Sequence, residues 1–540
     1  MTRGGPHSID WKRQGEGMTA TVSADTRWMQ GEAAVDRQQW SVAEVAYLDA
    51  LALDPRHLPS LIGLSTLYSR QDRHVLAYQA LMRAIGITPP HPGITYGLAQ
   101  RLRYFNEFDA LERCLADPRF AGSAPVHVLA RAVVMLSSIG AHEAAVRLAE
   151  RALERDPNSA PALYVRGNLH LFSGEPELAE LRYEQSLKAD PRLYQNSWML
   201  ASVRTQTAES NHVDRLRRQL SEATPGKEGE AYLSYGLHKE LHDLGDYPGA
   251  WSALDRGCRV KRTHVAYAPE EEAALVDQAI ATFDARFLRV TSQVEQTAVP
   301  IFILGMHRSG TTLLERMLSG HSNVADAGET GAFDAQVHLA ADHHYANHFD
   351  AKVLARAPGM DMDAIARGYA RAASWLSRGK PFFTEKLPMN FWNIGLIARA
   401  LPQAKIINLV RDPMDTCFSN LRTLFAGVAT YSYDQAELAH FYLQYRRLMQ
   451  HWLDVLPGRI LQVDYDELVS APDVVGQRVA EYCGLRYQPS IADVSRSSGR
   501  VATASAALAR QGIRRDRGMV WRHYEAQLAP LRAGLSSFYS

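Results

Sequence analysis

The segment Val299–Leu318 reads VPIFILGMHRSGTTLLERML and contains an apolar run, a short loop bounded by glycines and an amphipathic stretch. This order predicts a strand, a tight turn and a helix, as in a P-loop-type three-layer α/β sandwich with a mostly parallel sheet. Gly305 and Gly310 have the spacing of a nucleotide-binding P-loop, in which backbone N–H groups and a helix N-terminus bind anionic oxygens. We therefore expect a phosphate-binding loop, followed by a helix that opens with Thr311 and Thr312.

The loop differs at one position from the P-loops that bind nucleoside triphosphates. Those loops carry a Lys that reaches the β- and γ-phosphates. This chain has Thr311 at that position, and Arg308 is the permanently charged residue of the loop. The sequence thus predicts a donor that is a shorter anion than a nucleoside triphosphate. The alternative is a strand–turn–helix corner in which the glycines serve packing alone.

The segment resembles the 5′-phosphosulfate loop of sulfotransferases that use 3′-phosphoadenosine 5′-phosphosulfate (PAPS). The resemblance is to tyrosylprotein sulfotransferases and to bacterial sulfotransferases fused to tetratricopeptide (TPR) repeats. Three later strings resemble the same enzymes: FFTEKLP at 382–388, KIINLVRDPMDTCFS at 405–419 and QVDYDEL at 462–468. The resemblance covers approximately residues 264 to 540. It implies a PAPS-dependent sulfotransferase that releases 3′-phosphoadenosine 5′-phosphate (PAP).

The same resemblance assigns roles to individual residues. It implies that Lys386 is the catalytic lysine and that Arg411 and Ser419 bind the 3′-phosphate of the donor. The further donor contacts that it implies are Arg308, Ser309, Gly310, Thr311, Thr312 and Tyr465.

A segment near the C-terminus, VATASAALARQGIRRDRGMVW at 501–521, resembles the loop with which the family covers the 3′-phosphate. It implies that Thr503, Ser505 and Arg510 also contact the donor. The segment departs from the family pattern at 516–520, and the cation could instead come from Arg514, Arg515 or Arg517. A basic run is more often a solvated face.

The second signature can also be interpreted without the family. Lys405–Val410 is a continuous apolar run, as expected for a strand buried on both faces. Arg411 follows it, where a parallel strand delivers side chains to the ligand crevice at its carboxyl end. Arg411 alone could form a buried ion pair, but with Ser419 two helical turns later it is better explained as a phosphate site. We expect Asp412 to cap the next helix or to orient Arg411.

The base that takes the proton from the acceptor hydroxyl is assigned to Glu329. The string NVADAGETG at 323–331 resembles the segment in which tyrosylprotein sulfotransferases keep a glutamate base. A carboxylate can serve if a closed site raises its pKa or if the transition state leads the proton transfer. The alternative role for Glu329 is to cap the following helix. The rival bases are His307, His321, His343 and His344.

Sulfuryl transfer is expected to depend on positioning and on stabilisation of negative charge, as phosphoryl transfer does, and we expect no metal. Lys386 would act on the oxygen that bridges sulfur and the 5′-phosphate. An exposed, solubilising lysine is the alternative. The apolar run around Lys386 favours function, because an unpaired charge there would be costly.

Composition excludes some partners. The chain has 540 residues with 59 basic and 59 acidic side chains, so no global field recruits nucleic acid or an anionic membrane. Its four cysteines lack C-x-x-C spacing, which indicates a reducing compartment and no structural zinc. Residues 1–26 lack the apolar core of a signal peptide and are expected to be disordered. We expect a bacterial, cytoplasmic enzyme.

The part of the chain before residue 263 is repetitive. Asp–Pro or Thr–Pro steps place prolines at 55, 89, 157 and 191, on a grid of 34 residues, which is the TPR period. The predicted organisation is a TPR-like helical repeat domain over 27–262, a helical linker over 263–298 and a sulfotransferase domain over 299–540. A generic helical array is the alternative.

TPR solenoids present a concave groove to peptides. The acceptor is therefore expected to be a peptide or protein hydroxyl, with tyrosine the first candidate. The repeats could instead mediate homodimerisation or docking while the acceptor is a glycan, lipid or small metabolite. The rival from another class is a TPR scaffold that carries a degenerate nucleotide-binding domain. The retained charged residues of both phosphate sites argue against that rival.

Overall fold

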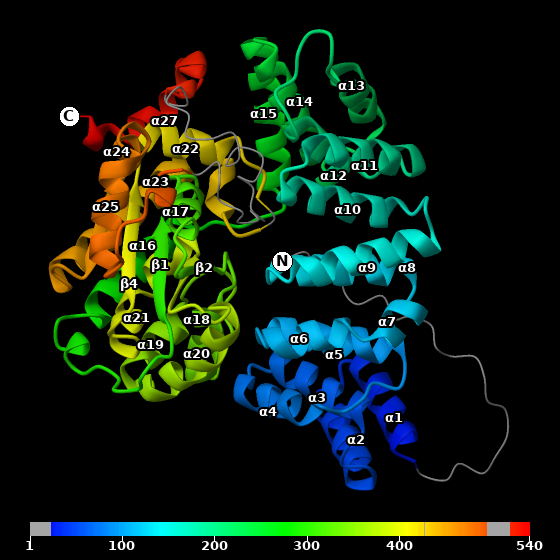
Figure 1. Ribbon diagram of the computed structural model, residues 1–540. Coiled ribbons are helices and arrows are strands. Elements are labelled where there is room, and N and C mark those ends of the chain that lie inside the picture. Colours follow the sequence, from blue (N-terminus) through cyan, green and yellow to red (C-terminus); the bar gives the residue numbers. More distant parts are fainter. Residues whose placement is uncertain (1–22, 426, 494–518, 540) are drawn as a thin grey trace. The chain divides into compact units, whose positions relative to one another are not determined.

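The computed structural model describes residues 23–425, 427–493 and 519–539 (Figure 1). The chain forms two compact units, residues 1–101 and 102–540. The first contains α1 (Ala24–Asp36), α2 (Trp40–Leu53), α3 (Leu58–Arg70), α4 (His74–Ala84) and most of α5 (Pro92–Tyr104). The second begins with the end of α5 and continues with α6 (Phe108–Leu115), α7 (Pro118–Ser123), α8 (Val126–Ser138), α9 (His142–Arg155), α10 (Ala160–Ser173), α11 (Pro176–Ala189), α12 (Tyr194–Ser202), α13 (Val213–Glu222), α14 (Glu228–Asp243), α15 (Tyr247–Arg262) and α16 (Pro269–Thr282).

Apart from the short helix α7, the helices up to α11 follow one another as pairs with the predicted period. Helices α2, α9 and α11 end directly before the Asp–Pro steps, because proline cannot continue a helix. The turn within each pair contains one residue with a left-handed backbone, and these residues are 34 positions apart: Gln38, Asp72, Asn106, Gly140 and Gly174. This regularity confirms the helical TPR-like architecture.

The helical region begins at Ala24, three residues before the predicted boundary at residue 27. The Ser23 side chain accepts a hydrogen bond from the Thr26 backbone N–H (3.1 Å) and caps α1, so the helix starts earlier than the sequence suggested. The expectation of disorder over 1–26 is therefore wrong for residues 24–26. The rest of that segment, residues 1–22, lies outside the described residues.

Within the described residues, five parallel strands form one sheet in the order β2-β3-β1-β4-β5. They are β1 (Val299–Gly305), β2 (Val324–Asp326), β3 (Phe382–Lys386), β4 (Lys405–Val410) and β5 (Ile460–Asp464). The helices among and after the strands are α17 (Thr311–Ser319), α18 (Ala332–Ala341), α19 (Ala351–Arg356), α20 (Met362–Leu376), α21 (Ile394–Ala400), α22 (Pro413–Leu421), α23 (Gln435–Val455), α24 (Tyr465–Ser470), α25 (Pro472–Cys483) and α27 (Ala529–Gly534). Short 3₁₀ helices span Phe287–Arg289, Ala357–Gly359, Pro388–Trp392, Thr430–Tyr433, Pro489–Ile491, Val520–Tyr524 and Ser536–Phe538.

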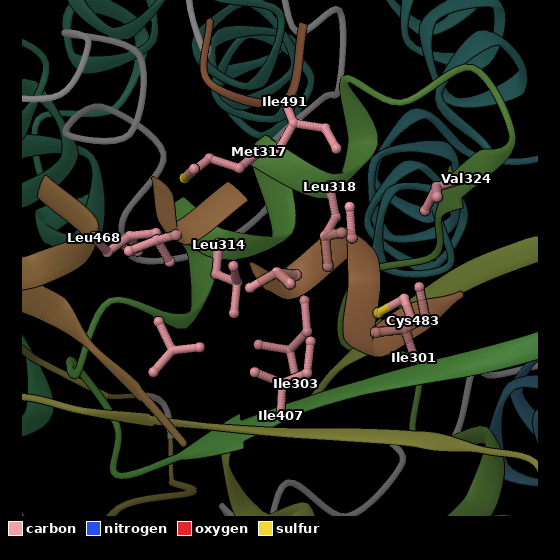
Figure 2. Close-up of a cluster of buried hydrophobic side chains, with 14 of the residues drawn as sticks. Ile301, Ile303, Leu314, Met317, Leu318, Val324, Ile407, Leu468, Cys483 and Ile491 are labelled. Carbon is pink, nitrogen blue, oxygen red and sulfur yellow. The ribbon is translucent and has the colours of Figure 1, made fainter. Parts of the chain in front are cut away.

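Helices cover both faces of the sheet. On one face, Ile303 of β1 belongs to a buried apolar cluster with Leu314 and Leu318 of α17 (Figure 2). On the other face, the ring of Phe302 lies against those of Phe333 in α18 and Tyr369 in α20, with centroids 5.9 and 6.0 Å away. The result is three layers around a parallel sheet, which confirms the predicted α/β fold of this part of the chain.

Small residues allow the paired helices to approach closely. Gly167 of α10 lies under Tyr183 of α11, whose side chain is fully buried and whose hydroxyl donates to Asn168 Oδ1 (2.7 Å). A Cβ at position 167 would lie 2.5 Å from Tyr183 Cε1, which is closer than real contacts allow. The fit between α10 and α11 therefore depends on this glycine.

Gly167→Ala is expected to lower the stability of the repeat region by about 1–3 kcal/mol, the usual cost of overpacking a filled core. The measurement is the thermal unfolding midpoint of the full chain. Gly122→Ala is the matched control, because Gly122 is also helical but no atom lies within 4 Å of the Cβ that the change would add. Equal midpoints for the Gly167 variant and the unaltered protein would show that the two helices can separate at no cost.

Candidate functional site

Three predicted site residues meet at one edge of the sheet. Lys386 is the last residue of β3 and Arg411 directly follows β4, and β1 runs between these two strands. The loop with Arg308 follows β1 and leads into α17. Because the strands are parallel, the three basic residues gather at their carboxyl ends, where open α/β sheets bind ligands.

The loop after β1 has an unusual backbone. Gly310 has φ 107° and Arg308 has φ 68°, both in the left-handed region. A Cβ on Gly310 would overlap the ring of Tyr465, so the loop can approach that ring only with glycine at this position. Thr311 and Thr312 follow, buried, at the start of α17.

The buried hydroxyl group of Ser309 indicates a ligand site. Its side chain is 1 % exposed, and its hydroxyl has no hydrogen-bond partner within the part of the chain that the structure describes. A buried hydroxyl without a partner is costly. An anionic oxygen bound in the loop would supply the missing partner, so the loop fits the phosphosulfate group that the sequence suggested.

The structure connects the two predicted phosphate signatures through Arg308 and Ser419. The Arg308 Nε donates to Ser419 Oγ in α22 (3.2 Å). Sequence reasoning had paired Ser419 with Arg411. The guanidinium of Arg411 lies 4.6 Å from the centre of the Tyr465 ring and 3.7 Å from Asp415 Oδ2. Arg411, Ser419, Tyr465 and the loop thus form one continuous basic region.

Asp412 has the predicted structural role. Its Oδ1 accepts a hydrogen bond from the Asp415 backbone N–H (2.8 Å) and caps α22. Its Oδ2 accepts from the Tyr539 hydroxyl (3.0 Å). The side chain therefore fixes the start of the helix that carries Ser419.

Lys386 forms an ion pair with Glu329. Its side chain is 1 % exposed and its Nζ donates to Glu329 Oε1, whereas the Glu329 side chain is 40 % exposed. The Lys386 backbone N–H donates to Gly328 O (3.0 Å) and holds the loop after β2 against β3. The two residues predicted as catalytic are therefore in direct contact, with a buried ammonium group and an accessible carboxylate.

Glu315 completes this cluster, and sequence reasoning missed it. Its Oε2 lies 4.0 Å from Lys386 Nζ. Its Oε1 accepts a hydrogen bond from Thr384 Oγ1 (3.4 Å), and the carboxyl group also accepts one from the Gly328 backbone N–H. Burial raises the pKa of Glu315 to about 8, although Lys386 opposes the rise. The signal in the sequence was a carboxylate between Leu314 and Met317, on the apolar side of the predicted helix.

Glu385 holds the other end of the same loop. It precedes Lys386 in β3 and points to the opposite face of the sheet. It accepts hydrogen bonds from the Tyr369 hydroxyl (2.5 Å) and from the Phe333 backbone N–H (3.4 Å) at the start of α18. Burial raises its pKa to about 7. Consecutive residues of β3 thus anchor the segment from Gly328 to Phe333 on both sides.

Of the four histidines considered as bases, His307 lies in the loop between β1 and α17. Its Nδ1 is 2.8 Å from the Tyr431 hydroxyl, and burial lowers its pKa to about 4, so the ring is neutral at pH 7. The other three are in structural contacts: His321 Nε2 with the Arg486 carbonyl (3.0 Å), His343 Nε2 with Asp350 Oδ2 (2.6 Å) and His344 stacked on Tyr104 (4.8 Å).

Some predictions are outside what the structure describes. Thr503, Ser505, Arg510, Arg514, Arg515 and Arg517 lie in the segment 494–518, which is not among the described residues. Among the residues that are described, no three His, Cys, Asp or Glu side chains form a cluster that could hold a metal ion. No helix in the described ranges has the length and apolar character needed to cross a membrane.

The α/β part is similar to known proteins. The sequence profile of the sulfotransferase family matches residues 300–489. An uncharacterized protein of Aquifex aeolicus (strain VF5) is 28 % identical over 441 residues, 78 % of this chain and 56 % of that protein. A putative protein-tyrosine sulfotransferase of Caenorhabditis briggsae is 25 % identical over 191 residues, 35 % of this chain and 66 % of that protein. The chain thus spans less than two thirds of the length of either relative.

This chain is similar to the solved structure of the sulfotransferase domain from the Synechococcus PCC 7002 olefin synthase. It is 18 % identical, with a TM-score of 0.32, over 47 % of this chain and 98 % of that one. The family profile covers β1, the loop after it, Lys386 and Arg411, which are the elements that build the site. Residues 300–489 of this chain thus match the profile of the sulfotransferase family, and a TPR-like helical region precedes them.

Proposed function

We propose that the protein transfers a sulfuryl group from PAPS to a hydroxyl acceptor on a peptide or protein, with tyrosine the first candidate. The observation that carries the proposal is the Lys386–Glu329 ion pair beside a loop with a buried hydroxyl that lacks a partner. A cation and a carboxylate in contact provide the two groups that such a transfer needs, one for the leaving oxygen and one for the acceptor proton.

The residues around the loop fit the donor substrate PAPS. Ser309, Thr311 and Thr312 would contact the sulfate and 5′-phosphate together with Arg308, whose guanidinium is oriented by Ser419. Arg411 would bind the 3′-phosphate, and its stacking on Tyr465 keeps the guanidinium in place for a charge-assisted hydrogen bond. Arg308 and Arg411 provide one cation for each phosphate group, which supports PAPS over a donor with one anionic group.

The ion pair makes the two proposed catalytic groups interdependent. Lys386 Nζ donates to Glu329 Oε1, so the ammonium group holds the carboxylate beside it. PAPS supplies a sulfuryl group attached through oxygen to its 5′-phosphate. As the bond between sulfur and that oxygen breaks, Lys386 would stabilise the charge left on the oxygen, and Glu329 would accept the proton of the acceptor hydroxyl. His307, neutral and bonded to Tyr431, contributes packing beside the loop.

The proposed acceptor rests on two observations. The helical region is of the TPR type, whose concave surfaces commonly bind peptides. The Caenorhabditis briggsae relative is named a putative protein-tyrosine sulfotransferase, and the match covers 35 % of this chain. We propose a cytoplasmic reaction, in keeping with four cysteines that form no disulfide.

The donor can be tested by binding alone. The full chain is expected to bind PAP without added Mg²⁺ and to bind ATP at least tenfold more weakly, because Thr311 replaces the lysine that reaches a γ-phosphate. Isothermal titration with each nucleotide, with and without Mg²⁺, gives the comparison. Tight, Mg²⁺-dependent binding of ATP followed by its hydrolysis would contradict the proposed function.

Two substitutions are expected to separate chemistry from binding. Glu329→Gln keeps the shape of the proposed base but not its basicity, so turnover should fall by about a hundredfold with little change in PAP affinity. Arg411→Ala removes a charge-assisted contact and should weaken PAP binding by about 2–3 kcal/mol, while turnover at saturating PAPS stays within a few-fold. PAP titrations and rates with labelled PAPS and a tyrosine-containing peptide measure both effects. An active Glu329→Gln protein beside an inactive His307→Gln protein would reassign the base.

The buried carboxyl group of Glu315 predicts a pH dependence of stability. Its pKa is raised from 4.5 to about 8 in the folded protein, so the folded state binds a proton that the unfolded state releases within this range. Stability should therefore fall as the pH rises from 5 to 8. Glu315→Gln cannot titrate and should show a smaller fall in thermal midpoint between these pH values. Parallel curves for the two proteins would mean that Glu315 is already ionised, held so by Lys386.

A further inference from the structure

The turn between α5 and α6 lies against the loop that carries Glu329. Asn106, in this turn, donates a hydrogen bond from Nδ2 to the carbonyl oxygen of Gly331 (2.8 Å), although the two residues are 225 positions apart. Gly331 stands two residues after Glu329 and is the N-cap of α18, with φ 64°. A side chain of the repeat region thus contacts the backbone of the proposed catalytic loop.

A hydrogen bond from Arg103 fixes the orientation of the Asn106 side-chain amide. Arg103 Nη1 donates to Asn106 Oδ1, and Arg103 Nε donates to Ser138 Oγ in α8 (3.0 Å). A guanidinium group can only donate, so it must face the amide oxygen and leave the amide nitrogen to Gly331. Burial also lowers the pKa of Arg103. The donor is therefore preset by neighbouring repeat residues.

Other contacts join the same two regions. The rings of Phe108 in α6 and Trp375 in α20 have centroids 5.3 Å apart, and Trp375 Nε1 donates to Glu112 Oε2 (3.4 Å). In the next helix pair, the Gly140 carbonyl oxygen accepts a hydrogen bond from Arg378 Nη2 (3.4 Å). The Asn106 contact is thus part of a surface that includes the turns of two successive repeats.

The repeat itself does not require asparagine at position 106. The turn needs a left-handed backbone, and the equivalent positions one and two repeats later are Gly140 and Gly174, with φ 79° and 80°. Glycine adopts this conformation more readily than asparagine does. The side-chain amide of Asn106 is therefore an addition to the turn, and the described contact that uses its nitrogen is the one with Gly331.

We propose that Asn106 is a positioning residue, through which the repeat region fixes Gly331 and with it the Glu329–Lys386 pair. This inference rests on the proposed function. The loop is held at Gly328 by Glu315 and Lys386 and at Phe333 by Glu385, all from the sulfotransferase-family domain. Asn106 supplies the restraint between these points. The active site is then complete only when the repeat region is docked.

The test is Asn106→Gly in the full chain, a change that restores the residue found at the same turn of later repeats. Loss of one hydrogen bond should speed amide hydrogen exchange of residues 326–333 by about fivefold to tenfold. Gln38→Gly is the matched control, since Gln38 has the same turn position and φ 58° in the first helix pair. It should leave exchange in 326–333 unchanged. Asn106→Asp, which keeps a residue tolerant of this backbone but lacks the N–H donor, should behave like Asn106→Gly.

Kinetics separate positioning from a general structural role. With labelled PAPS and a tyrosine-containing peptide, Asn106→Gly should lower kcat by about threefold to tenfold and leave PAP affinity unchanged. In a Glu329→Gln background it should have no further effect, because the base that it positions is gone. Unaltered exchange in 326–333, or equal losses in PAP affinity and kcat, would overturn the inference. Failure of the unaltered protein to bind PAP would instead reject the proposed function, and the exchange result would still decide whether Asn106 restrains the loop.

Discussion

A buried ammonium group is the constraint on which the site depends. Lys386 ends a central strand with almost no exposure, and an unpaired charge there would cost several kcal/mol. Glu329 supplies the partner from a loop, and the buried carboxyl group of Glu315 on α17 lies 4.0 Å from the same ammonium group. The strand, the loop and the helix must therefore meet correctly for the charge to be tolerated. The electrostatic requirement of one residue thus fixes the relative placement of three elements.

The basic region has a different physical origin. Arg411 stacks on Tyr465, and the same ring lies so close to Gly310 that no side chain fits there. Tyr465 therefore supports the guanidinium on one side and shapes the loop on the other. Rigid support of this kind reduces the entropy lost when an anion binds. Tyr465, the first residue of α24, thus contacts the predicted site through the faces of its ring.

Much of the fold was predictable because local patterns carry it. The Pro steps on a 34-residue grid and the apolar runs of β1 and β4 are short-range signals, and each gave the correct element. The boundary at Ala24 was missed because a single capping serine moved it. Lys386 and Glu329 were assigned catalytic roles by resemblance, and their contact was not predicted. Glu315, Glu385 and the link between Arg308 and Ser419 depend on which side chains meet across the sheet, and no spacing in the sequence encodes that.

The contact between Asn106 and Gly331 also bears on how the chain is made. During synthesis the helix pairs leave the ribosome before the strands of the sheet, and such repeats can fold as they appear. The turn at Asn106, with its amide already oriented by Arg103, is then in place before Gly331 has been translated. The sheet forms later, because β1 must wait for β3 and β4. The repeats can thus be folded before the parallel sheet forms, and the loop with Gly331 can then pack against them.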